Sequence, residues 1–242
     1  MFAVNTRNTP PPMARSLRVL AALLGYPDAR MRGHLPEMRE LLRDERALSK
    51  ARCAELDALM DSLQHADPLQ AEADYVDLFD RGRATSLHLF EHVHGDSRER
   101  GPAMIDLGQT YEQAGLILAE GELPDFLPAM LEFVSTQPPG EGKAFLGEMT
   151  HLLSALFGAL QQRHSAYASV LGALLELAGE QAQALPPLPP AGEETLDESW
   201  AEPPVFDGCS AKGQARPGQV QTIHVLPPSR SAQANPPSGV VA

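Results

Sequence analysis

Three histidines lie close enough in the sequence to suggest a metal site. His88, His92 and His94 are accompanied by Glu91 and Asp96. The i, i+4 spacing of His88 and His92 would put two imidazoles on one face of a helix. A catalytic zinc ion needs three protein ligands and an open position for water, and the segment lacks the His-Glu-x-x-His order. We therefore expect hydrogen-bonded or solvated histidines and no metal site, with a metal-dependent enzyme as the alternative.

Four arginines flank the segment 82–101: Arg81, Arg83, Arg98 and Arg100. Guanidinium groups bind phosphate in a bidentate manner, so these side chains could contact an anionic cofactor or an acidic partner surface. The simpler interpretation is a set of salt bridges with nearby carboxylates, namely Asp80, Asp96 and Glu99. The sequence contains no recognisable hydrolase or nucleotide-binding motif, and we expect no enzymatic turnover.

Large apolar residues surround the same segment, with carboxylates among them. Most of the apolar side chains are expected in the core. Those left exposed would line a groove with an acidic rim, which is a surface suited to a basic amphipathic helix.

The elements that position these residues are predicted to be helices, because apolar residues recur at helical spacing and no stretch shows sustained strand alternation. Proline, glycine and capping residues separate them. Ser49 and Asp67 are the expected N-caps of two of the helices. The expected helices span about 13–25, 36–46, 49–66, 68–81, 102–118, 126–134, 145–160 and 167–177. We predict an all-α, single-domain helical bundle over residues 13–185.

Composition narrows the possible partners. The chain has 242 residues, with 19 Lys and Arg against 32 Asp and Glu, which gives a formal net charge of −13. Such a charge disfavours nucleic-acid binding, which needs basic surface to displace counterions, and it permits a basic partner. The two cysteines, Cys53 and Cys209, form no CxxC pair and suit a reducing compartment.

The two ends of the chain differ from the helical part. Residues 1–12 are predicted to form a flexible arm. Residues 186–242 hold half of the chain's 22 prolines and are expected to be largely disordered, with an aromatic island at 196–209. Residues 13–25 are predicted to form an amphipathic helix rather than a secretion signal. No run of apolar residues in the sequence is long enough to span a membrane. We therefore expect a cytoplasmic protein that does not insert into a membrane.

One long stretch carries a family resemblance. Residues 75–107, and within them 78–100 above all, closely resemble the NarJ family of respiratory nitrate reductase assembly chaperones, within the wider NarJ/TorD/DmsD group. Shorter matches lie at Leu23–Asp28, Tyr111–Leu116, Glu122–Asp125 and Leu160–Arg163. The tail around Trp200 and Asp207–Cys209 is also similar, so that the resemblance covers about residues 15–210.

The resemblance implies an all-α chaperone without catalytic activity and without a permanently bound cofactor. Members bind the basic, apolar N-terminal peptide of the nitrate reductase alpha subunit and hold the apo-enzyme. They release it after molybdenum-bis(pterin guanine dinucleotide) has been inserted, which delays docking on the membrane partner. Proteins of cofactor biosynthesis are possible further partners, and direct carriage of the cofactor is the alternative role.

On this basis the residues around 82–101 receive specific roles. We expect peptide contact through the apolar side chains of Tyr75, Phe79, Leu87, Phe90 and Tyr111. The basic residues of the peptide are expected to meet Glu91, Glu112 and Asp125. Sequence alone does not separate the members of this set that form the core from those that line a groove.

Overall fold

The computed structural model describes residues 12–95, 97–119 and 121–183, which belong to one compact unit, Met1–Thr195. Over these residues the secondary structure is helical, with one isolated antiparallel bridge between His88 and Phe126. The predicted all-α fold class is confirmed. Nearly all of the predicted N-terminal arm and the whole Pro-rich tail lie outside the described residues. No helix within the described residues is both long enough and apolar enough to cross a membrane.

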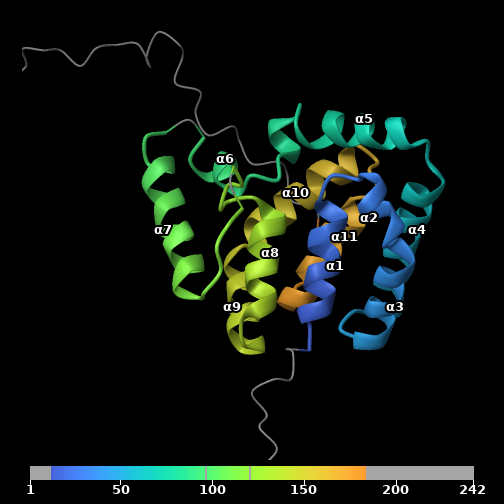
Figure 1. Ribbon diagram of the computed structural model, residues 1–242, viewed down its shortest axis with the longest axis horizontal. Coiled ribbons are helices and arrows are strands. Elements are labelled where there is room, and N and C mark those ends of the chain that lie inside the picture. The colour runs from blue at the N-terminus through green and yellow to red at the C-terminus, as the bar shows by residue number, and fades with distance from the viewer. Residues whose placement is uncertain (1–11, 96, 120, 184–242) are drawn as a thin grey trace, which may run out of the picture. The chain divides into compact units, whose positions relative to one another are not determined.

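The helices form a bundle whose order is visible in Figure 1. α1, α8, α10 and α11 pack together in its middle, α3 and α4 form one flank, and α7 stands at the opposite flank. The elements are α1 (Ala14–Leu24), α2 (Ala29–Gly33), α3 (Leu35–Glu45), α4 (Lys50–His65), α5 (Pro68–Phe79), the 3-10 turn η2 (Arg83–Thr85), α6 (Leu89–Val93), α7 (Arg100–Gln113), α8 (Leu127–Thr136), α9 (Pro139–Glu148), α10 (Thr150–Gln162) and α11 (Ala168–Ala178).

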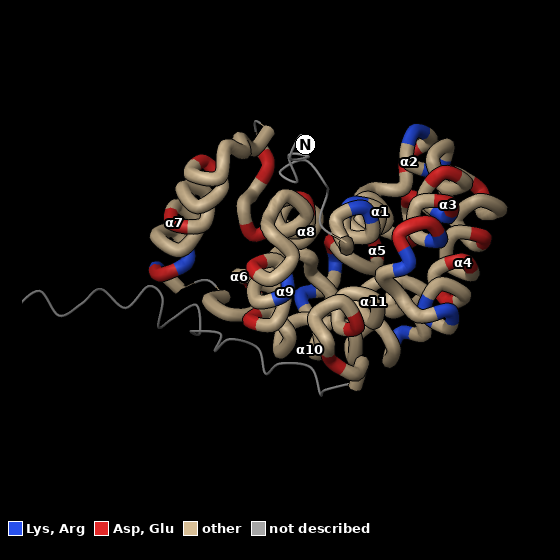
Figure 2. Tube along the Cα trace, turned by 90° about the horizontal axis from the view of Figure 1, so that it is seen from below, with Lys and Arg blue, Asp and Glu red and all other residues tan. Residues whose placement is uncertain are grey.

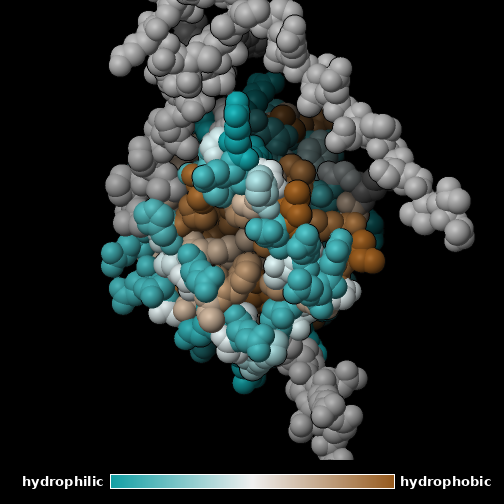
Figure 3. Space-filling view, turned by 90° about the vertical axis from the view of Figure 1, so that its left-hand side faces the viewer, coloured by the Kyte–Doolittle hydropathy of each residue, from teal (hydrophilic) through white to brown (hydrophobic). Residues whose placement is uncertain are grey.

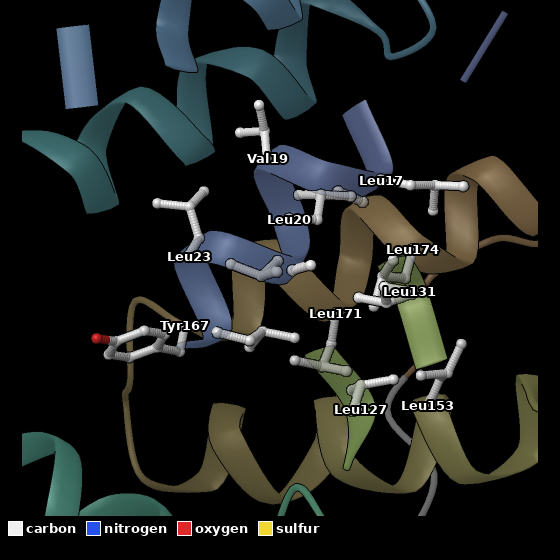
Figure 4. Close-up of a cluster of buried hydrophobic side chains, with 14 of the residues drawn as sticks. Leu17, Val19, Leu20, Leu23, Leu127, Leu131, Leu153, Tyr167, Leu171 and Leu174 are labelled. Atoms are coloured by element: carbon white, nitrogen blue, oxygen red, sulfur yellow. The ribbon is translucent and has the colours of Figure 1, made fainter. Parts of the chain in front are cut away.

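The core is built around two helices of different character. α1 is amphipathic: Leu17, Leu20 and Leu24 are fully buried, while Arg15 and Arg18 are exposed. α11 is apolar on almost every side and is buried nearly throughout, as expected for a helix in the centre of a bundle. Figure 4 shows leucines of α1, α8, α10 and α11 pointing toward one another in this core. Their burial is the main source of stability.

Local signals fix several helix ends where the sequence predicts them. The Ser49 side chain accepts a hydrogen bond from the Arg52 N–H at the start of α4. Asp67 does the same for the Gln70 N–H at the start of α5, with Pro68 in the first turn. A further cap comes from a distant residue, because the Glu45 carboxylate accepts the N–H groups of Arg15 and Ser16.

The structure corrects the predicted boundaries at four places. α2 was not expected. The segment 82–101 is not a continuous loop, because it contains η2, α6 and the start of α7. The single helix predicted over 145–160 is interrupted at Met149 between α9 and α10. The helix predicted over 102–118 ends at Gln113, since Gly115 adopts a left-handed φ of 79°.

Leu20 gives a direct test of the core. Replacement by alanine is expected to lower the free energy of unfolding by about 3 kcal/mol, because it leaves a cavity among α1, α8 and α11. Urea denaturation followed by circular dichroism measures the change. Leu69→Ala is the matched control, since Leu69 is exposed, and it is expected to change stability by less than about 0.5 kcal/mol. Equal losses for the two variants would contradict the burial of Leu20.

Candidate functional site

The surface formed by α6, α7 and the segment that leads to α8 exposes several large apolar side chains. α7 has 14 residues, yet Tyr111 is the one residue of this helix that is buried. Four large apolar side chains in this region are between 44% and 90% exposed, namely Val93, Ile105, Ile117 and Leu123. Figure 3 shows apolar atoms gathered in the middle of this side of the molecule, in a hollow with polar atoms around it. We call these four residues, together with α7, the α6–α7 surface.

One strip of α7 is open to a close neighbour. Gly101, Ile105, Gly108 and Glu112 follow one another at steps of three and four residues, which places them on one face of the helix. A Cβ atom added at Gly101 or Gly108 would meet nothing within 4 Å. The strip is therefore not covered by another helix within the described residues, and a second backbone can approach it closely.

Acidic residues lie along the same region. Glu112 is exposed on the strip of α7, and Glu122 is exposed in the segment that follows. Figure 2 shows acidic positions on α7 and on the stretch between α7 and α8. The surface therefore combines exposed apolar side chains with negative charge, which favours a basic, apolar ligand.

Asp125 holds this region together from inside. Its carboxylate is fully buried, with His88 Nδ1 at 3.2 Å, the Phe90 N–H donating at 3.2 Å and the Arg100 guanidinium at 3.6 Å. The Asp125 carbonyl accepts a hydrogen bond from the Leu89 N–H. Since burying a carboxylate is costly unless such partners pair with it, Asp125 ties α6 and the first residue of α7 to the segment before α8.

The burial of Asp125 corrects its predicted role. A carboxylate with no exposed surface does not meet a basic ligand in this conformation, so Asp125 positions the site rather than contacting a peptide. Of the other two predicted acidic contacts, Glu112 is exposed, whereas Glu91 is half-buried and pairs with Arg100.

The predicted apolar contacts are mostly core residues. Tyr75, Phe79, Leu87 and Tyr111 are all buried, and Phe90 is half-buried. The expectation of an exposed groove at the first four positions is therefore corrected. Tyr75 and Phe79 turn inward from α5 onto the Tyr167 ring. The Tyr111 hydroxyl donates to the Pro124 carbonyl at 2.8 Å, which anchors the C-terminal half of α7. Burial raises the pKa of the Tyr75 and Tyr111 phenols well above the usual range.

The exposed apolar residues Val93, Ile105 and Ile117 were not among the predicted contacts, because they stand outside the regular apolar stripes. Ile105 follows Met104 directly and points away from the side of α7 that carries Tyr111. The sequence signal that could have revealed Ile105 is its position between two glycines, Gly101 and Gly108, on one face of the helix.

The four arginines are divided between different partners. Arg81 pairs with Asp77 on α5, at 2.6 Å, and Arg100 pairs with Glu91 and Asp125. Arg81 and Arg83 line a cavity of about 280 Å³ together with His88 and Glu91. Arg98 is exposed. Among the described residues, salt bridges account for Arg81 and Arg100, and their partners are Asp77, Glu91 and Asp125. The expected partner Asp96 lies outside the described residues, and contact with an anion stays a prediction for Arg83 and Arg98.

The three histidines also have separate partners. His88 faces Asp125, His92 Nε2 lies 2.9 Å from the Ser86 carbonyl, and the His94 ring packs edge-on against Phe90. Within the described part of the chain, no group of three His, Cys, Asp or Glu side chains is placed to hold a metal ion. The geometry gives no support to the metal-dependent alternative.

Comparison with known proteins identifies the family to which this chain belongs. The family described as nitrate reductase delta subunit matches residues 45–172. The NarJ nitrate reductase molybdenum cofactor assembly chaperone of Escherichia coli (strain K12) is 47% identical over 67% of this chain and 69% of its own length. The probable NarW chaperone of the same strain is 42% identical over 67% of this chain and 68% of its own length. The probable NarJ chaperone of Bacillus subtilis (strain 168) is 33% identical over 64% of this chain and 84% of its own length.

The chain therefore belongs to the nitrate reductase delta subunit family, whose relatives named above are assembly chaperones, and the resemblance predicted from the sequence is confirmed. The fold is shared with a redox enzyme maturation protein of Archaeoglobus fulgidus that has been described as putative. The TM-score is 0.53 at 17% identity, covering 73% of this chain and all of that one.

The contact between His88 and Asp125 predicts a pH-dependent contribution to stability. The hydrogen bond to Asp125 raises the pKa of His88 above its usual value of 6.5. The stabilisation is therefore complete below about pH 6.5 and is lost as the pH rises through the higher pKa of the folded state. The wild type is expected to exceed His88→Gln in unfolding free energy by more at about pH 5.5 than at about pH 8.5.

Urea unfolding at the two pH values measures this difference. His151→Gln is the control, because His151 is exposed, and its effect is expected to be the same at both. A difference between wild type and His88→Gln that stays constant or grows toward high pH would contradict the proposed pairing.

Proposed function

We propose that the chain is a chaperone of nitrate reductase assembly that binds the N-terminal peptide of the catalytic alpha subunit. It would hold the apo-enzyme until molybdenum-bis(pterin guanine dinucleotide) has been inserted, and so delay docking of that subunit on its membrane partner. The observation that carries the proposal is the α6–α7 surface. Its exposed apolar side chains lie on and near α7, a helix with a single buried residue. The relatives named as nitrate reductase assembly chaperones supply the client.

The strip on α7 suits a peptide that binds as a helix. Gly101 and Gly108 let a second backbone come close, Ile105 offers an apolar contact between them, and Glu112 is placed to meet a cation. A basic, apolar peptide would satisfy both features at once. The net charge of −13 adds long-range attraction, which raises the rate of association more than the final affinity.

The energetics favour reversible binding. Burying three large apolar side chains of a peptide contributes about 5–8 kcal/mol, and ordering a flexible peptide costs about 2–5 kcal/mol. The net free energy of binding is therefore modest, which suits a chaperone that must release its client after maturation. Since release would precede membrane docking, we place the protein in the cytoplasm.

Direct carriage of the cofactor is the weaker alternative. The cavity beside Arg81 and Arg83 is about 280 Å³, which is below the range of about 300–1,000 Å³ typical of small-molecule sites and small for a pterin dinucleotide. It is also lined by the carboxylates Asp80 and Glu91, which repel phosphate. We therefore assign no resident cofactor to the chain, and we propose proteins of cofactor biosynthesis as further partners.

Ile105 is the position at which the peptide proposal is tested most sharply. Ile105→Asp is expected to weaken binding of the client's synthetic N-terminal peptide at least about tenfold, a loss of about 1.4 kcal/mol, because it places a charge in the apolar contact. Glu112→Gln is expected to weaken binding less and to reduce its dependence on salt. Titration calorimetry at low and high salt measures both effects.

Two variants serve as controls for this experiment. Leu69→Asp introduces the same charge at an exposed apolar residue of α5, away from α7, and is expected to leave peptide binding unchanged. Asp106→Asn is the control for Glu112→Gln, because it removes a charge from α7 at a position outside the glycine strip. Unchanged affinity in Ile105→Asp, or equal losses in Ile105→Asp and Leu69→Asp, would contradict the proposed site.

A further inference from the structure

The outward side of α5 carries a second apolar stripe, distant in the fold from α7 (Figure 1). Leu69, Ala73 and Val76 follow the i, i+4, i+7 spacing of one helix face. Leu69 is 76% exposed, Ala73 is exposed and Val76 is half-buried. The opposite side of the helix is the one that buries Ala71, Tyr75 and Phe79 in the core. α5 is therefore apolar on two sides, and only one of them is covered within the described residues.

Tyr26 extends this stripe. The Tyr26 ring is 48% exposed and lies edge-on to Tyr75, with 5.6 Å between ring centroids. Its hydroxyl donates to Glu72 Oε2 at 3.1 Å, which holds the ring beside α5. Tyr26, Leu69, Ala73 and Val76 contribute the apolar lining of an open cavity of about 430 Å³. We call this cavity and the stripe the α5 outer face.

Carboxylates dominate the charge of the α5 outer face, and Arg81 is the cation that lines its cavity. Residues 67–80 contain five carboxylates and no Lys or Arg, the carboxylates being Asp67, Glu72, Asp74, Asp77 and Asp80. Glu72 lies on one side of the apolar stripe and Asp77 on the other, by helical position. An exposed apolar stripe between two rows of carboxylates is complementary to a helix with an apolar stripe between rows of cations.

The chain already places one cation at this edge. Arg81 is exposed and its guanidinium lies 2.6 Å from Asp77 Oδ1. Exposed ion pairs of this kind are weak, so a cation of a partner could replace Arg81 at little cost. Arg81 thus marks a position where a guanidinium or ammonium group is accepted.

We propose that the α5 outer face is a second docking surface, which receives a cationic amphipathic helix of a partner protein. A second copy of this chain fits poorly, because pairing the two faces would bring like charges together. Nucleic acids and anionic lipid surfaces are disfavoured for the same reason. The partner helix would insert an apolar side chain between Tyr26 and Leu69, with Lys or Arg opposite Glu72 and Asp77. Two separate docking surfaces would let the protein contact a second protein while its α6–α7 surface is occupied.

The test uses a synthetic helical probe and the full chain. The probe has about five turns, with leucine every three to four residues and lysine elsewhere, and its matched control carries glutamate in place of lysine. Fluorescence anisotropy measures binding of the lysine probe to the wild type and to Ile105→Asp, in which the α6–α7 surface is disabled. We expect both proteins to bind the lysine probe and neither to bind the glutamate probe.

Variants of the α5 outer face then locate the binding. In the Ile105→Asp background, Leu69→Glu, at an exposed position that does not threaten folding, is expected to weaken binding of the lysine probe at least tenfold. The double variant Glu72→Gln and Asp77→Asn is expected to weaken it and to flatten its salt dependence. The charge-matched control, Glu40→Gln with Asp44→Asn, removes two exposed carboxylates from α3, and it is expected to change the affinity less than twofold. Calorimetry with the client peptide is expected to give the same affinity for Leu69→Glu and wild type.

Three results would overturn the proposal. One is a lysine probe that binds Ile105→Asp equally well with and without the α5 substitutions, and another is a lysine probe that does not bind Ile105→Asp at all. The third is self-association of the wild type, seen by sedimentation, that Leu69→Glu abolishes, because the face would then join two copies of the chain. Failure of the client peptide to bind would overturn the proposed function. It would not affect the test of the α5 outer face, because that test uses the lysine probe.

Discussion

The arrangement of the candidate site depends on one buried carboxylate. Asp125 has no exposed surface and meets His88, the Phe90 N–H and Arg100 within the fold. Because an unpaired buried charge is costly, the segments that carry these partners are held to the stretch before α8. Tyr111 adds a second attachment through the Pro124 carbonyl. α7 is therefore fixed near its start and toward its end, and the face with Ile105 is left without a partner from the described residues.

This constraint leaves surfaces of an acidic helical bundle open for the binding role that we propose. The leucine core of α1, α8, α10 and α11 supplies stability and leaves the flanks free for recognition. Two flanks present apolar side chains among carboxylates, one on α7 and one on α5. Both suit basic, apolar segments of other polypeptides, which is the chemistry expected of a protein that holds a client and then releases it.

The sequence predicts the fold better than it predicts the site. Caps such as Ser49 and Asp67 and the apolar stripe of α1 are local signals, so the helices they define were predicted closely. The short helix α6 depends on contacts with Asp125 across the fold, and no local pattern reveals it. The same limit applies to the site residues. Tyr75 and Phe79 have a spacing that suits either core or groove, and tertiary packing decides between them. Glu112 is exposed on α7 and its contact with a peptide stays a prediction, whereas the burial of Asp125 follows from partners distant in sequence.

The central claim is that the client's N-terminal peptide binds on the exposed face of α7, and hydrogen exchange tests it most directly. Exchange of backbone amides would be followed by mass spectrometry for the full chain with and without the synthetic peptide. The account predicts slower exchange in α7 and α6 when the peptide is present, with α3 and α4 unchanged. Protection confined to α3 and α4, or a peptide that binds without slowing exchange in α7, would contradict it.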